Sequence, residues 1–177
     1  GYIEQEKVAS PLRRGNVYAR IRMIILYDQS SAEAALVVGT SNKTESLLGY
    51  STLFGDSAWA INPLGDLYKR QVRQLSRAMG VPDSILTKAP SADLWLGQTD
   101  EEELGMSYDE ADRMLHLLVD RRDRPEQVVQ KGFDETKVNA VVERLVRYQF
   151  KRVPGPIPKL STRTLNVDWL YSRDWQT

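Results

Sequence analysis

Apolar residues recur at helical spacing in several separate segments of the chain. The first is residues 16–25, where aliphatic side chains fall on one stripe and Asn16 is placed to cap the helix that this stripe predicts. A second helix is predicted over residues 66–79, because a glycine and a proline follow it as they do at many helix ends. Capping residues at Ser107 and Asp134 predict two more helices, so the second half of the chain should be largely helical.

One short apolar segment has a different character. Residues 34–38 are wholly apolar and are followed by Gly39 and Thr40, a pattern that predicts a strand buried on both faces, as in a parallel sheet. Directly afterwards, Asn42 and Glu45 have the spacing of a capping box, so a helix should start at the carboxyl end of this strand. Together these patterns predict an α/β fold in which helices cover both sides of a parallel sheet.

Two further segments show neither the helical spacing of apolar residues nor a strand-like apolar run. Residues 88–106 are predicted to form a long loop of the kind that often serves as a lid. Prolines at every second position near the start of residues 153–177 exclude a helix there and predict an extended tail over the surface. The length of 177 residues suits one domain with a single substantial core.

Composition narrows the classes of function. The 24 lysines and arginines balance 24 aspartates and glutamates, so no global field favours nucleic acid or an anionic membrane as a partner. The chain has no cysteine and one histidine, His116, which argues against a disulfide framework, a zinc site or a redox enzyme. We interpret His116 as a surface or satisfied core residue. No apolar run reaches the roughly 18 residues that span a bilayer, and no secretion signal is recognisable, so the predicted location is the cytoplasm.

The carboxyl end of the predicted strand is the place where chemistry is expected, because open parallel sheets bind ligands there and a helix amino terminus favours phosphate. Glu45 either completes the capping box, the commoner case, or brings a carboxylate to a Mg²⁺ ion on phosphate oxygens. Asp56 suits either a tight turn or a ligand contact. Lys69 opposes the dipole near a helix start, which favours an anion close by.

Six motifs, taken in order, resemble the successive motifs of the NAD synthetases. They are residues 15–23, 38–45, 54–56, 63–69, 89–94 and 100–105. The likeness runs from about Asn16 to Pro158 and keeps the order and spacing of the family. The chain is therefore identified as a member of this family.

The resemblance implies the N-type ATP pyrophosphatase fold, with a Rossmann-like sheet and a single domain over residues 1–177. It implies a two-step reaction in which the carboxylate of deamido-NAD attacks the α-phosphorus of ATP, and ammonia then displaces AMP to give NAD. Mg²⁺ is the implied cofactor and ATP a co-substrate. The implied assembly is a homodimer, with the apolar faces of the helices at Asn16 and Asp134 as candidate contacts, and a glutaminase is a possible source of ammonia.

Matching the motifs residue by residue assigns roles to individual side chains. Asp56 and Lys69 are implied to act in catalysis, and Glu45 is the implied metal ligand. Asp100 and Glu103 belong to the implied lid. The implied ATP contacts are Thr40, Lys69 and Ser91, and the implied deamido-NAD contacts are Asn16, Arg20 and Lys151.

The sequence departs from the family pattern in one important respect. The Ser-Gly-Gly-x-Asp-Ser loop that cradles pyrophosphate does not occur in the 177 residues. We expect a chain truncated before residue 1, in preference to a loop on another polypeptide or a loss of catalysis. Two alternatives stay open: a non-catalytic module that retains dimerisation or dinucleotide binding, and a related amide-forming synthetase that uses another acid.

Overall fold

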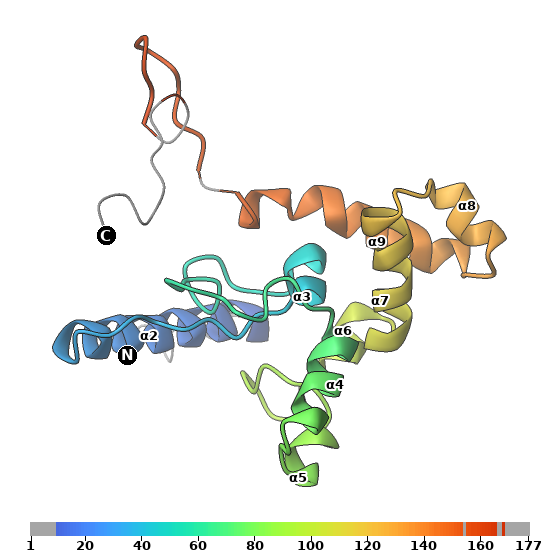
Figure 1. Ribbon diagram of the computed structural model, residues 1–177, viewed down its shortest axis with the longest axis horizontal. Helices are drawn as coiled ribbons and strands as arrows, with labels where there is room; N and C mark the ends of the chain where they lie inside the picture. The colour runs from blue at the N-terminus through green and yellow to red at the C-terminus, as the bar shows by residue number, and fades with distance from the viewer. Residues whose placement is uncertain (1–9, 154, 166–167, 169–177) are drawn as a thin grey trace.

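The computed structural model describes residues 10–153, 155–165 and 168, and these are predominantly helical (Figure 1). Residues 1–9 of the predicted domain, and residues 154, 166–167 and 169–177 of the predicted tail, lie outside the described residues. The elements are α2 (Pro11–Ala32), α3 (Lys43–Leu48), α4 (Lys69–Ala78), α5 (Asp83–Leu86), α6 (Asp100–Leu104), α7 (Tyr108–Leu115), the π-helical turn η1 (His116–Asp120), α8 (Pro125–Gln130), α9 (Glu135–Arg147) and the 3-10 turn η2 (Gln149–Lys151).

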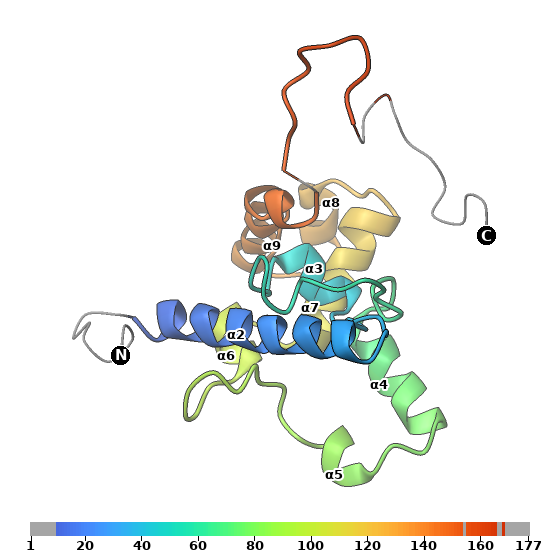
Figure 2. The same cartoon turned by 90° about the vertical axis from the view of Figure 1, so that its left-hand side faces the viewer.

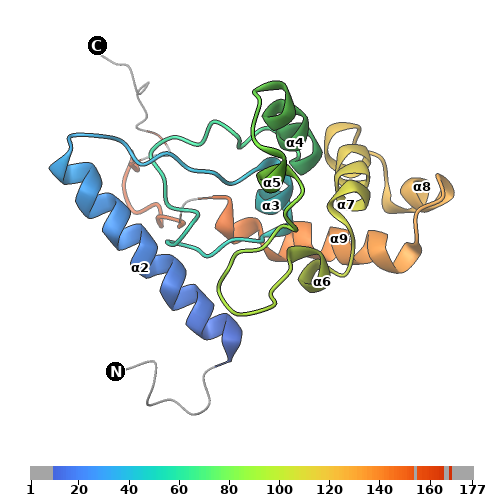
Figure 3. The same cartoon turned by 90° about the horizontal axis from the view of Figure 1, so that it is seen from below.

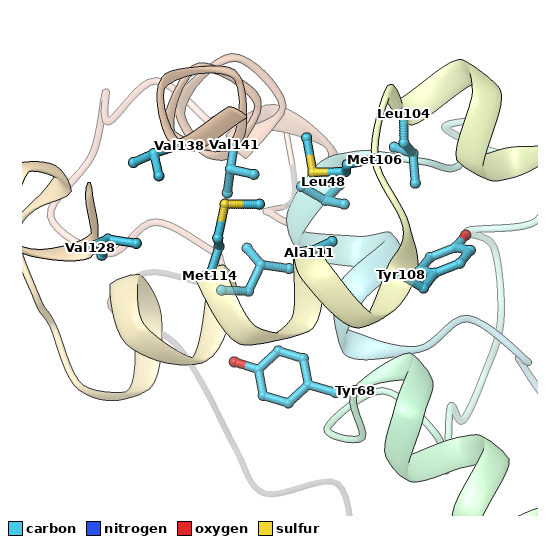
Figure 4. Packing of buried hydrophobic residues seen from close by; sticks show 11 residues of the cluster. Leu48, Tyr68, Leu104, Met106, Tyr108, Ala111, Met114, Val128, Val138 and Val141 are labelled. Atoms are coloured by element: carbon cyan, nitrogen blue, oxygen red, sulfur yellow. The ribbon is translucent and has the colours of Figure 1, made fainter. Parts of the chain in front are cut away.

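The hydrophobic core lies among the helices of the second half and α3. Figure 4 shows side chains of α3, α7, α8 and α9 meeting in one cluster. Leu48, Met114 and Val141 are fully buried there. Burial of such side chains contributes roughly 1.5–3 kcal/mol each, so this cluster supplies the rigid base of the molecule. The prediction of a largely helical second half is confirmed.

Local capping fixes the ends of the core helices. Asn42 accepts a hydrogen bond from the Glu45 amide, and the Glu45 carboxylate accepts one from the Asn42 amide, so the predicted capping box is confirmed. Ser107 caps α7 through the Glu110 amide, and Asp134 caps α9 through the Lys137 amide. These three helices begin where the sequence places them.

The first helix is longer than the periodic pattern predicts. Helix α2 begins at Pro11, and the Ser10 hydroxyl accepts a hydrogen bond from the Arg13 amide, so Ser10 is the cap. The prediction of Asn16 as the cap is wrong, because proline at the first position fixes a helical φ one and a half turns earlier. Asn16 lies inside the helix, and its side chain is free to bond elsewhere.

The aliphatic stripe of α2 does not pack into the core of this chain. Ile21, Ile24 and Ile25 are 44%, 61% and 56% exposed, and only Gly15 and Ala19 of the helix are buried. In Figure 2 this helix lies across the front of the molecule, and in Figure 3 irregular segments separate it from α7 and α9. By contrast, Val138 and Val141 place the apolar face of α9 inside the core. The prediction that this face of α9 is a subunit contact is therefore wrong.

A parallel sheet is not formed within the described residues. Val38 makes an isolated parallel bridge with Ile61, and Gly39 donates a hydrogen bond of 2.7 Å to the Ile61 carbonyl. Leu36 and Val38 are 71% and 59% exposed, so the prediction of a strand buried on both faces is wrong for this chain. Burial on both faces needs layers of structure on each side. Here the bridge from Val38 to Ile61 is the one strand-like pairing of this segment among the described residues.

Two other segments differ from the sequence prediction. Helix α4 begins at Lys69 instead of residue 66, because residues 64–67 form a turn in which the Leu67 amide donates to the Leu64 carbonyl. Within the predicted loop 88–106, Asp100–Leu104 is helical. The acidic first turn suits a helix amino terminus, and Gly105 ends the helix at φ +72. Across the described residues, no helix is both long enough and apolar enough to cross a membrane.

Candidate functional site

A cleft of about 810 Å³ lies between α2, the loop after α3, α4, the 85–98 segment and the end of α9. Its walls include nine of the residues predicted from sequence. These are Asn16, Thr40, Glu45, Asp56, Lys69, Ser91, Asp100, Glu103 and Lys151. Arg20 is not part of the wall; its guanidinium donates to the Leu53 carbonyl at 3.2 Å. Residues far apart in the chain thus meet around one hollow large enough for a nucleotide.

Glu45 and Lys69 form the best-defined corner of this cleft. The Lys69 ammonium lies 2.8 Å from one Glu45 carboxylate oxygen, and both side chains are mostly buried. The other oxygen of Glu45 accepts from the Asn42 amide. Lys69 also lies over the ring of Tyr108, 4.9 Å from its centre. The anion that the position of Lys69 favours is thus supplied, in this structure, by Glu45.

Thr40 and Ser41 reach this corner from the extended segment. Thr40 is exposed to the cleft, and the Ser41 carbonyl is held by the side chain of Asn62 at 2.8 Å. The amide of Lys43 donates to the Leu67 carbonyl, and that of Glu45 donates to Asn42. These two amides at the helix start are therefore already paired in this structure.

Asp56 faces the cleft from the loop after α3. One of its oxygens accepts a hydrogen bond of 2.7 Å from the Thr52 amide. Although the side chain reaches the surface of the cleft, desolvation by the surrounding protein raises the pKa of its carboxyl above the usual value. The bond from Thr52 opposes this shift. A carboxyl group in such surroundings is suited to proton exchange with a bound reactant.

Two of the side chains predicted to contact a dinucleotide, Asn16 and Lys151, hold the loop after α3 in place. The Asn16 oxygen accepts a hydrogen bond of 2.7 Å from the Thr52 hydroxyl. The Lys151 ammonium donates to the carbonyls of Gly49 and Ser51 at 2.7 and 2.5 Å and lies over the ring of Tyr148. Desolvation lowers the pKa of Lys151. Lys151 therefore brings a partly buried cation to the wall of the cleft.

The predicted lid segment is attached at both ends. Near its start, the Arg22 guanidinium donates to the carbonyls of Ala92 and Asp93, and Ser91 accepts from the Asp93 amide. At its other end Asp100 is 4% exposed and accepts hydrogen bonds from two tyrosine hydroxyls. Those hydroxyls belong to Tyr50 and Tyr108, at 3.0 and 2.9 Å.

Glu103 lies one turn after Asp100 and accepts a hydrogen bond of 2.7 Å from Gln98. Burial and the neighbouring carboxylates raise the pKa of Tyr50 and Tyr108, so both stay protonated and donate. Asp100 is thus an anchor of the segment in this structure.

Several side chains at the cleft carry no signal in the sequence. Arg22 reaches residues 70 positions away, and Arg144 donates to the Glu103 carbonyl from 41 positions away. No periodic pattern predicts such contacts. Tyr108 lies within a capping motif and could be found as a helix start, but not as the partner of Asp100. His116 is 54% exposed and lies 3.1 Å from Asp120, which confirms its interpretation as a surface residue.

The corner formed by Glu45 and Lys69 offers one carboxylate, that of Glu45, to a metal ion. Among the described residues, no group of three or more histidines, cysteines, aspartates and glutamates is arranged to hold a metal. Mg²⁺ usually binds through one or two carboxylates together with substrate phosphates and water, so Glu45 alone fits an ion that arrives with a triphosphate. The donor set does not suit zinc, since His116 lies outside the cleft lining.

Comparison with known proteins places this geometry in a family. The family model described as NAD synthase matches residues 2–155. The NH(3)-dependent NAD(+) synthetase of Chlorobium phaeobacteroides is 53% identical over 165 residues, which are 93% of this chain and 60% of that protein. The chain thus spans about 60% of the length of the curated relatives it matches.

Solved structures agree with this assignment. An NMN synthetase from Francisella tularensis superposes with a TM-score of 0.73 at 34% identity, and covers 89% of this chain and 60% of its own. An NH3-dependent NAD synthetase from Campylobacter jejuni, in complex with the nitrate ion, gives 0.70 at 30% identity with the same coverage. The similarity to these α/β enzymes extends over most of the present chain, and the chain belongs to the NAD synthase family.

Proposed function

We propose that the protein converts deamido-NAD to NAD with ammonia and ATP, releasing AMP and pyrophosphate. The observation that carries the proposal is the cleft itself. Nine of the ten residues that the family resemblance implies line this one hollow, although they come from segments up to 135 positions apart, from Asn16 to Lys151. Relatives named NH(3)-dependent NAD(+) synthetases at about 53% identity support the same activity.

The ATP end of the cleft is assigned to the corner of Thr40, Lys69 and Ser91. Joining a carboxylate to a triphosphate brings like charges together, so the site needs a cation held ready before the reactants meet. Lys69 meets that need because Glu45 and the Tyr108 ring hold its ammonium in place. Preorganised cations of this kind typically contribute about 3 kcal/mol to lowering a barrier.

Glu45 is the proposed ligand of Mg²⁺ carried by ATP. When bound, the ion neutralises charge on the phosphate oxygens and favours departure of pyrophosphate. The carboxylate lies 2.8 Å from Lys69, so a metal at Glu45 would share this anion with the lysine.

Asp56 is assigned to the second step, the attack of ammonia on the adenylated carboxyl carbon. The nitrogen gains a positive charge as its bond to carbon forms, and it must lose a proton as AMP departs. The carboxylate of Asp56 is the proposed acceptor of that proton. Its raised pKa makes it a stronger base than an ordinary aspartate.

The exposed apolar stripe of α2 is the proposed contact with a second copy of the chain. Ile21, Ile24 and Ile25 lie side by side on a helix that also brings Asn16 to the cleft. A dimer through this helix would cover the stripe and place the partner beside the dinucleotide end. Sedimentation of the purified protein tests this assembly.

The reaction is tested with the full-length gene product that contains this chain. It is supplied with ATP, Mg²⁺, deamido-NAD and ammonium, and pyrophosphate, AMP and NAD are measured. We expect one of each per turnover, with no release of pyrophosphate when deamido-NAD is omitted. Binding of deamido-NAD without any turnover would instead support the non-catalytic module.

A second acid substrate is favoured by one observation, the similarity to the NMN synthetase of Francisella tularensis. The ATP corner does not choose between acids, because Thr40, Glu45 and Lys69 would contact phosphate in either case. Competition between deamido-NAD and the deamidated form of NMN distinguishes the two. We expect the dinucleotide to have the higher kcat/KM, and the reverse order would assign the mononucleotide reaction.

A further inference from the structure

Asp112 is a buried carboxylate outside the cleft lining. It belongs to α7, is 6% exposed and is bonded by both of its oxygens. One accepts from the hydroxyl of Thr44 at 2.5 Å, and the other accepts from the amide of Arg70 at 2.8 Å. Burial of a carboxylate is costly, so its presence here needs a reason.

Thr44 also bonds the first residue of α4, Lys69. The Thr44 hydroxyl, fully buried in α3, accepts a hydrogen bond of 2.9 Å from the amide of Lys69. The first two amides of α4, those of Lys69 and Arg70, are therefore satisfied by side chains of two other helices. Tyr68, which precedes the helix, makes no side-chain cap. Such amides at a helix start need acceptors, and a carboxylate nearby suits the dipole.

This arrangement fixes the reactive corner from behind. Lys69 and Glu45 line the cleft, whereas Thr44 and Asp112 do not. Because Thr44 directly precedes Glu45 and bonds the backbone of Lys69, the two charged side chains are tied to each other through their main chains as well as through their ion pair. A shift of α4 would carry the Lys69 ammonium away from Glu45.

We propose that Asp112 and Thr44 are positioning residues for the Lys69–Glu45 corner, and so for the transfer of the adenylyl group; this rests on the proposed function. They touch no substrate. Their contribution is to hold the α4 amino terminus against α3 so that the ammonium lies where charge develops on the phosphates. Misplacement of a catalytic group by about 1 Å can lower a rate by about a hundredfold.

The test compares two substitutions of the same buried residue in the full-length gene product. Thr44→Val keeps the shape and removes the hydroxyl, whereas Thr44→Ser keeps the hydroxyl. We expect Thr44→Val to lower kcat for pyrophosphate release by about ten- to a hundredfold with a much smaller change in KM for ATP, and Thr44→Ser to restore kcat to within about threefold. Asp109→Asn, an exposed carboxylate on the same helix as Asp112, should leave kcat unchanged.

A second readout separates positioning from simple stability. Labelling of Lys69 with an amine-reactive reagent, followed by mass spectrometry, reports whether its ammonium still lies against Glu45. Lys137, paired with Glu110 at 2.7 Å, is the internal reference. We expect Thr44→Val to increase labelling of Lys69 and to leave Lys137 unchanged. If Thr44→Val does not fold, Asp112→Asn replaces it, since it retains one acceptor oxygen, and an intermediate effect is expected.

The outcomes decide the two proposals separately. Wild-type kcat and wild-type labelling of Lys69 in a Thr44→Val protein with lowered thermal stability would show a cap without a positioning role and overturn the inference. Equal increases in labelling of Lys69 and Lys137 would show general loosening and overturn it too. If the wild-type protein releases no pyrophosphate, the proposed function fails, and the labelling ratio still decides whether Thr44 and Asp112 hold the corner.

Discussion

The packed helices α3, α7, α8 and α9 differ from α2 and residues 33–41 and 50–66 in how far their apolar side chains are buried. Leu48, Met114 and Val141 are fully buried in the first, while Ile24 and Leu36 are 61% and 71% exposed in the second. The side chains of both regions are equally apolar. The difference lies in their neighbours, since α3, α7, α8 and α9 face one another and α2 faces irregular segments.

This contrast explains how the cleft is built. The corner proposed to bind ATP rests on the packed helices, because Glu45 is in α3 and Lys69 is held by α3 and α7. Its opposite wall is α2, which contributes Asn16 and holds the 92–93 segment through Arg22. A rigid corner facing a more loosely packed wall suits a site that orients phosphates firmly and admits a large second substrate.

The largest effect is expected at Gly49, which joins the two regions at the end of α3. Its φ is +66, and a Cβ atom would overlap the ring of Tyr148. Gly49→Ala should lower the free energy of unfolding by roughly 2–6 kcal/mol, since left-handed strain and overpacking add. Gly105→Ala is the matched control, because φ is +72 there with no atom within 4 Å of a Cβ. Equal costs in urea unfolding would show that the Tyr148 contact is unimportant.

The next largest loss of stability is expected from a substitution in the hydrophobic core. Met114→Ala should cost about 2–5 kcal/mol by removing a fully buried side chain from between α7 and its neighbours. Ile25→Ala, on the exposed stripe of α2, should cost at most about 0.5 kcal/mol at low protein concentration. A cost that grows with concentration would mean that a second copy covers the stripe. If Ile25 is as costly as Met114 in a dilute sample, the contrast between the regions is wrong.

Glu45 lies where the two regions meet, and its two roles can be separated by substitution. Glu45→Gln retains an oxygen that can accept from the Asn42 amide, while Glu45→Ala loses both the cap and the charge. Both should lower the Mg²⁺-dependent rate by about a hundredfold, or about 2.7 kcal/mol. Thermal unfolding should show that the alanine variant, which loses the cap as well as the ion pair with Lys69, is the less stable of the two. A glutamine variant with the wild-type rate would show that Glu45 caps α3 and does not bind the metal ion.

The smallest effect is a pH dependence of opposite sign at two carboxylates on the continuous helix α7 and η1. Burial raises the pKa of Asp112, so its charged form opposes folding and stability falls as the pH rises from about 4 through the folded pKa. The hydrogen bond from Lys43 lowers the pKa of Asp120, so its stabilisation is present above about pH 4 and is lost as the pH falls through the folded pKa.

The direction of each pH dependence is measured by urea unfolding of the wild type and of two variants at a series of pH values. Relative to wild type, Asp112→Asn should become comparatively more stable as the pH rises over its window. Asp120→Asn should become comparatively less stable over the corresponding window. Slopes of the same sign for both variants would contradict the assignment of burial to Asp112 and of ion pairing to Asp120.

Local signals in the sequence predict local structure in this protein. The capping box of Asn42 and Glu45 and the cap at Asp134 each involve partners three residues apart, so they can be found from spacing alone. The start of α2 at Ser10 was also within reach, because serine followed by proline is typical of a helix start.

Longer connections could not be found in this way. The bonds from Thr44 to Asp112 and from Tyr50 to Asp100 join residues 68 and 50 positions apart, and their side chains have no period to reveal them. The predicted strand failed for a related reason, since its burial depends on neighbouring layers and not on residues 34–38 themselves. Nine of the ten residues that the family resemblance singled out line the cleft, but the resemblance did not indicate which of them hold one another.

The most direct test of the central claim is a crystal structure of the full-length protein with Mg²⁺ and a non-hydrolysable ATP analogue. We expect triphosphate oxygens within hydrogen-bond distance of Thr40 and Lys69, with the metal ion at Glu45. A nucleotide bound elsewhere, with Glu45 still contacting only Asn42 and Lys69, would contradict this claim.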